Sequence, residues 1–177
     1  QVPTYHFLYE KVKMKDIEKT FGYLQKTNEV LNMVFEEYSG VPKQKLVKNY
    51  DPPISFVDLS LVEDNENKLR KMIQEENKEL LDFKKPLWKV VLYKLNEEKF
   101  CLYLNIHHLI TDGWSEGILL EEFNKIYNEI KDKGTVNLPE VDYGYLDWIN
   151  EEEFYLKEYG SEYLNYWMEE LKAPLPI

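Results

Sequence analysis

Two apolar segments joined by a short polar loop constrain the fold of this chain more than any other feature. Residues 87–95 and residues 100–107 are rich in apolar and β-branched side chains, and residues 96–99 between them read Asn-Glu-Glu-Lys. A polar loop of this length between two such segments is typical of a β-hairpin. We therefore expect two adjacent antiparallel strands near the middle of the chain.

Apolar residues at helical spacing lie on both sides of this hairpin. One helix is predicted over residues 16–25 with Asp16 as its N-cap, and a second over residues 65–81. A third is expected to begin after Asp112 and to end near Gly134. Strands and helices in one chain predict an α/β fold with a mixed, mostly antiparallel sheet covered by helices, largely on one face.

The remaining segments are less distinct. Residues 31–37 and 41–47 flank the turn signal Ser39-Gly40 and can form a second hairpin, although the first segment could instead continue the preceding helix. After Pro139 comes a helical stretch rich in Tyr and Trp, which Gly160-Ser161 is expected to divide into two helices. The proline-rich residues 173–177 are expected to form a linker.

Composition excludes several classes of protein. The net charge of −11 over 177 residues argues against binding to nucleic acid or to an anionic membrane surface, because both require a basic face. No apolar run approaches the roughly 20 residues that span a bilayer, and no signal-peptide pattern opens the chain. The single cysteine, Cys101, cannot form an internal disulfide, so a cytoplasmic protein is the simpler interpretation.

Two of the three histidines lie together where the second central strand ends, at His107 and His108. Adjacent strand residues point to opposite faces, so these two cannot bind one ion and no metal site is predicted. By spacing alone, His108 on an apolar face is more typical of a hydrogen-bonded core residue. Asp112 is expected to cap the following helix, and Gly113 could serve only close backbone packing.

Residues 107–113 read HHLITDG and match in full the HHxxxDG signature of condensation domains of nonribosomal peptide synthetases. The HxxxD core is shared by the wider chloramphenicol acetyltransferase-like superfamily. Similarity to other condensation-domain motifs extends along most of the chain, at residues 28–31, 57–60, 83–88, 145–148 and 166–174. The chain is thus identified as resembling the N-terminal lobe of such a domain, with residues 1–177 forming this lobe and the C-terminal lobe absent.

The resemblance implies an acyltransferase-like lobe and amide bond formation between two thioesters held on the phosphopantetheine arms of donor and acceptor peptidyl carrier proteins. It implies that His108 orients the attacking amine or accepts its proton, with His107, Asp112 and Gly113 as supports of the site. No cofactor is expected to bind the domain itself. Adenylation domains in the parent chain are the expected further partners, and the lobe alone is expected to be inactive.

The sequence departs from the family pattern where arginines are expected before the second hairpin. The first of these positions is occupied by Lys26 or Thr27, and the second by Asn32. Arg70 is the only arginine of the chain and lies elsewhere. Asp112 must therefore be held by backbone N–H groups, by a lysine or by an arginine outside the chain. Two other functions stay open: a coenzyme A-dependent acyltransferase of the same superfamily, and a non-catalytic module that recruits partners.

Overall fold

The computed structural model describes residues 2–48, 50–137 and 142–172. The chain divides into two compact units, Gln1–Pro139 and Glu140–Ile177.

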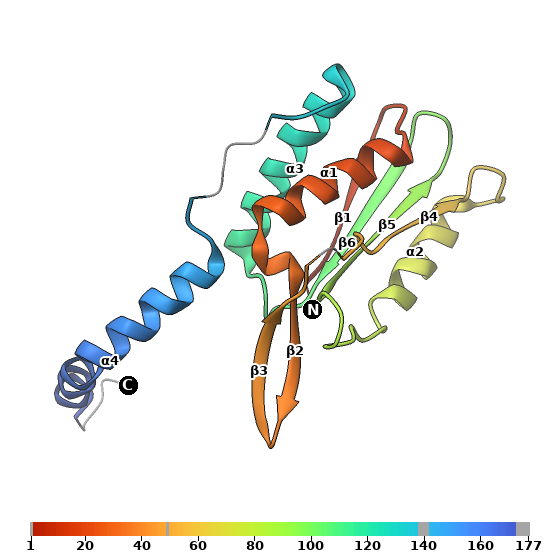
Figure 1. Cartoon of the computed structure of the whole chain (residues 1–177). Helices are drawn as coiled ribbons and strands as arrows, with labels where there is room; N and C mark the ends of the chain where they lie inside the picture. The colour runs from red at the N-terminus through yellow and green to blue at the C-terminus, as the bar shows by residue number, and fades with distance from the viewer. Residues whose placement is uncertain (1, 49, 138–141, 173–177) are drawn as a thin grey trace. The chain divides into compact units, whose positions relative to one another are not determined.

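A four-stranded sheet forms the centre of the first unit (Figure 1). Its strand order is β1-β6-β5-β4, formed by β1 (Val2–Leu8), β6 (Phe100–Ile106), β5 (Trp88–Lys94) and β4 (Ile54–Asp58). The strands β5 and β6 are antiparallel neighbours, as the hairpin pattern predicts. Only the β4–β5 pair is parallel, which confirms a mixed, mostly antiparallel sheet.

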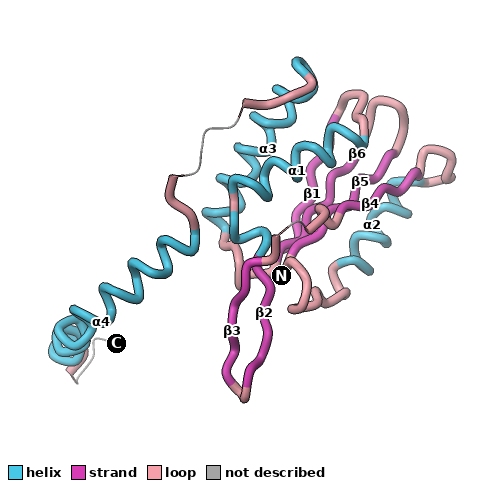
Figure 2. Tube along the Cα trace, in the orientation of Figure 1, coloured by secondary structure: helices cyan, strands magenta, loops and turns pink. Residues whose placement is uncertain are grey.

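One face of the sheet is covered by α1 (Met14–Thr27) and α3 (Gly113–Lys133) (Figure 2). The Phe21 ring of α1 stacks on Trp88 of β5 at 5.6 Å between centroids and lies 5.3 Å from the Phe123 ring of α3. These large apolar rings are almost completely buried, and their removal from water is the main force that holds both helices on the sheet.

The opposite face is covered by α2 (Asn65–Glu76). Leu69 of this helix is buried together with Tyr93 of β5 and Tyr103 of β6. The two longer helices of this unit thus lie on one face, as expected, and α2 covers the other. Both faces are covered because alternate residues of β5 and β6 are apolar on both sides, and each apolar face needs its own cover.

The second predicted hairpin is also present. The strands β2 (Met33–Tyr38) and β3 (Val41–Leu46) pair antiparallel and project from the first unit (Figure 1). Ser39 and Gly40 have φ values of 53° and 79°, the left-handed conformations that a tight two-residue hairpin turn requires. The alternative of a continued helix is wrong, because η1 (Glu29–Asn32) ends the helical segment first.

Two helix boundaries differ from the prediction. The first helix begins at Met14 with Lys13 as its N-cap, so Asp16 lies inside the first turn and does not cap it. There its negative charge still complements the helix dipole. The second helix ends at Glu76, five residues before the predicted end.

The second unit contains one helix, α4 (Tyr145–Glu170). It runs unbroken through Gly160-Ser161, so the predicted division into two helices is wrong. Gly160 ends a helix only where its backbone turns left-handed, and it is not among the residues with positive φ. The predicted linker at residues 173–177 lies outside the described residues. Among the residues that are described, no helix is long and apolar enough to cross a membrane.

Candidate functional site

The two histidines lie directly after β6 and occupy different environments. The strand ends at Ile106, but the His107 N–H still donates to the Leu87 carbonyl at 2.8 Å. His107 is half-buried, whereas the next residue begins a turn and leaves His108 exposed. The interpretation of His108 as a core residue is therefore wrong. Its side chain is available to a ligand.

The His107 imidazole organises the turn that follows it. Its Nδ1 accepts a hydrogen bond from the Leu109 N–H at 3.1 Å, and its carbonyl accepts one from the Ile110 N–H at 3.0 Å. Burial lowers the pKa of His107 below its ordinary value of 6.5, and the charge of His108 lowers it further. The ring is thus held neutral, with Nδ1 as the acceptor and the proton on Nε2.

Asp112 is the N-cap of α3, as predicted. Its backbone is extended, and its Oδ1 accepts a hydrogen bond from the Ser115 N–H at 2.7 Å. Hydrogen bonds from the backbone and side chain of Ser115 lower the pKa of the Asp112 carboxyl, and the charge of His108 contributes in the same direction. The carboxylate is therefore ionised, close enough to His108 to interact with it electrostatically, and fixed at the positive end of the helix.

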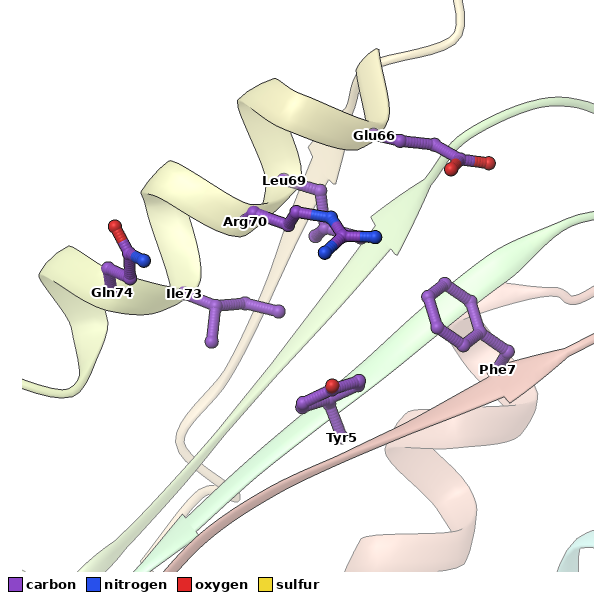
Figure 3. A pocket seen from close by; sticks show the side chains of 7 residues that line it. All are labelled: Tyr5, Phe7, Glu66, Leu69, Arg70, Ile73 and Gln74. Carbon is purple, nitrogen blue, oxygen red and sulfur yellow. The ribbon is translucent and has the colours of Figure 1, made fainter.

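Within the described residues, Asp112 is held by backbone N–H groups, one of the alternatives that the sequence left open. The Asp112 carboxylate accepts a hydrogen bond from a backbone N–H. Arg70, the only arginine of the sequence, lies on α2 and lines a groove with Tyr5, Phe7, Glu66, Leu69, Ile73 and Gln74. Figure 3 shows the Arg70 guanidinium directed off that helix over the strands. Asn32, at one of the family's arginine positions, exchanges hydrogen bonds with Gln25 at 3.0 Å and 2.8 Å.

Gly113 is the first residue of α3, and a Cβ atom built there would meet nothing within 4 Å. The interpretation that this glycine only permits close packing is wrong for the described part of the chain. Its missing side chain leaves open space at the start of the helix.

Sequence reasoning missed three apolar side chains around this space. Leu109 is 53% exposed, Trp114 81% and Ile118 47%. An exposed tryptophan and a half-exposed isoleucine in the first turns of a helix are characteristic of a surface that another protein segment or a ligand covers. The available signal was that Trp114 and Ile118 fall outside the stripe of α3 that contains the buried Leu119 and Phe123.

Within the described ranges, no group of three or more His, Cys, Asp or Glu side chains is placed to hold a metal ion. The chemistry that the site offers is that of an exposed imidazole next to an ionised carboxylate, at the N-terminus of a long helix.

Comparison with known proteins places this site in a family. A family model for the condensation domain matches residues 1–177. Phosphinothricin tripeptide synthetase of Streptomyces viridochromogenes is 26% identical over 170 residues, which are 94% of this chain and 16% of that protein. Surfactin synthase subunit 2 of Bacillus subtilis is 29% identical over 178 residues, which are 99% of this chain and 5% of that protein. The chain thus spans less than a fifth of either relative.

Solved structures share the fold at lower identity. The starter condensation domain of rhizomide synthetase superposes with a TM-score of 0.85 at 13% identity, covering 98% of this chain and 42% of that one. The epimerization domain from the third module of tyrocidine synthetase B superposes with a TM-score of 0.83 at 21% identity, covering 99% and 40%. With the family match over the whole chain, these likenesses lead to one conclusion: the chain belongs to the condensation domain family of nonribosomal peptide synthetases.

Proposed function

We propose that residues 1–177 are the N-terminal lobe of a condensation domain that forms an amide bond between a donor thioester and an aminoacyl acceptor. The observation that supports this most directly is the exposed His108 close to Asp112, the N-cap of α3, with open space at Gly113. The site offers an imidazole to a substrate and keeps its neighbouring groups fixed, which is the arrangement that acyl transfer to an amine requires.

In the proposed reaction, the acceptor amine attacks the carbonyl carbon of the donor thioester. A C–N bond forms and the C–S bond breaks, so the donor acyl group passes to the acceptor amine and the phosphopantetheine sulfur of the donor carrier is the leaving group. His108 orients the amine or accepts the proton that the nitrogen loses, and the leaving sulfur receives a proton in turn. The Gly113 N–H, at the positive end of α3, is the group we assign to the developing oxyanion. His107 and Asp112 hold the turn and the helix start.

A second lobe and two carrier proteins are the proposed partners. The chain corresponds to about two-fifths of the starter condensation domain, and the exposed Leu109, Trp114 and Ile118 form an apolar surface that a second lobe would cover. Substrates would arrive on the phosphopantetheine arms of donor and acceptor carriers, with adenylation domains in the same assembly and no cofactor held by the lobe itself. We infer a cytoplasmic location, in which the free, buried Cys101 stays reduced.

The experiment compares residues 1–177 alone with the same lobe joined to the second lobe of its parent synthetase. Each is incubated with loaded donor and acceptor carriers, and amide product is measured by mass spectrometry. We expect no product above background from the lobe alone, because thioesters in an open site are hydrated and poorly aligned, and product from the joined protein. Turnover by the lobe alone, or by the joined protein with a free coenzyme A thioester in place of the donor carrier, would contradict the proposal.

A further inference from the structure

A chain of ring contacts links the β2–β3 hairpin to the active-site turn. The Phe83 ring lies 5.2 Å from the His107 ring with an interplanar angle of 63°, and 6.4 Å from the Phe35 ring of β2 at 90°. Edge-to-face contacts of this kind restrict the orientation of both rings. His107 is therefore held from one side by a residue that is distant from it in the sequence.

Phe83 is itself fixed by its backbone. Its carbonyl accepts a hydrogen bond from the Phe35 N–H at 2.8 Å. On the other side, the Asp82 side chain accepts one from the Lys84 N–H at 3.0 Å, and the Asp82 carbonyl accepts one from the Lys85 N–H at 3.0 Å. The loop that carries Phe83 is thus a defined turn tied to β2.

Core packing does not account for this ring. Phe83 is 46% exposed, so about half of its apolar surface contributes nothing to the free energy of folding. What the ring does contact is His107, whose Nδ1 receives the Leu109 N–H and whose carbonyl receives the Ile110 N–H. Rotation of the imidazole would break the first of these bonds and release the turn that holds His108.

We infer that Phe83 is a positioning residue, whose ring fixes the His107 imidazole and through it the turn that presents His108. This role rests on the function proposed for His108, but the contact and its effect on the turn can be measured without any condensation reaction. A failure of the condensation assay and a failure of this inference are therefore distinguishable.

The experiment uses histidine-labelled and amide-labelled chain of residues 1–177 in NMR titrations. The three histidines give three sets of ring signals. In Phe83→Leu we expect the pKa of His107 to rise toward its ordinary value, because the ring that shields it from water is gone. We also expect the Leu109 amide to exchange about fivefold faster, as loss of one hydrogen bond predicts. Phe83→Tyr keeps the ring and should restore both values.

Phe56→Leu is the matched control, because Phe56 is 45% exposed and lies on β4, away from this chain of contacts. It should leave both quantities at their wild-type values. Phe35→Leu removes the ring that packs against Phe83, so the His107 pKa and the Leu109 exchange rate should change in the same direction as in Phe83→Leu. This variant replaces Phe83→Leu in the test if Phe83→Leu does not fold. The inference is overturned if a folded Phe83→Leu keeps the wild-type His107 pKa or the wild-type Leu109 exchange rate. If only Phe35→Leu folds, the same result in that variant overturns it.

Discussion

Oδ1 of Asp112 accepts a hydrogen bond from the backbone N–H of Ser115 at 2.7 Å. This bond satisfies one of the free N–H groups in the first turn of α3 and places an ionised carboxylate at the positive end of a 21-residue helix. The aspartate of the family signature is thus engaged with its own helix.

Asp112→Ala should lower the unfolding temperature of the chain, because the first turn of α3 loses both its cap and a favourable charge. Asp132→Ala, at the other end of the same helix, is the control. There a negative charge opposes the helix dipole, so its removal should be neutral or slightly stabilising. Thermal unfolding followed by circular dichroism compares the two variants. Equal unfolding temperatures for Asp112→Ala and wild type would contradict the cap.

His108→Ala and His107→Ala should differ in kind when placed in the joined two-lobe protein. His108 is exposed, so its replacement should leave the unfolding temperature unchanged and lower condensation by roughly 100-fold or more, as loss of a general base or orienting group does. His107 is half-buried against Phe83, and its replacement should cost about 1 kcal/mol of stability.

A carrier-loaded condensation assay beside thermal unfolding separates these effects. Full activity in His108→Ala would refute its catalytic assignment and favour a module that only recruits partners. Loss of the folded structure in His108→Ala would instead show that His108 has a structural role.

The lowered pKa of His107 predicts a pH dependence of stability. Burial holds its folded-state pKa below the ordinary value of 6.5. Between these two values the unfolded chain binds more protons than the folded chain, so the free energy of unfolding increases with pH. The contribution of His107 is fully present above pH 6.5 and is lost as the pH falls through the folded-state pKa.

Urea unfolding at intervals between about pH 5 and pH 7.5 measures this effect. His107→Gln cannot titrate, so the stability of the variant should depend less steeply on pH than that of wild type in this interval. The same slope in both proteins would show that His107 is not buried in the folded chain.

Cys101 should be inert in the folded chain. Burial raises the pKa of its thiol to about 12, and the side chain lies in the core beneath α2. The reactive thiolate is therefore scarce at neutral pH, and reagents cannot reach it. Labelling with a disulfide reagent should proceed only with unfolding, at a rate that rises with denaturant. Rapid labelling of the native chain, before any loss of circular dichroism signal, would contradict this.

Local patterns were sufficient for the elements with strong periodicity. The central hairpin, the α3 helix with its Asp112 cap and Gly134 end, and the Ser39-Gly40 turn follow from neighbouring residues, and the structure confirms each. The signature at residues 107–113 also marks the site by itself. These features depend on hydrogen bonds and dihedral preferences within a few residues of each other.

The missed strands illustrate the limit of such patterns. Both β1 and β4 lie at the edges of the sheet, and β1 begins with Val-Pro and includes Thr and His. Edge strands bury only part of their surface, so their sequences need not alternate strongly. They become strands because their backbone groups pair with those of a central strand, β1 with β6 and β4 with β5. Gly160 also shows that a local signal can be overridden, because its helical conformation depends on the flanking turns of α4 more than on the residue itself.

Sequence patterns alone predict the fold class, the position of the signature between strand and helix, and Asp112 as the cap of α3. The difference between the half-buried His107 and the exposed His108 could not be predicted in this way, because it depends on packing between distant segments. Phe83, which precedes His107 by 24 residues, contacts the His107 ring and is itself contacted by Phe35, and these contacts exist only when the hairpin and the loop after α2 have packed together. Contacts between distant segments depend on how elements pack, and spacing along a single chain does not encode them locally.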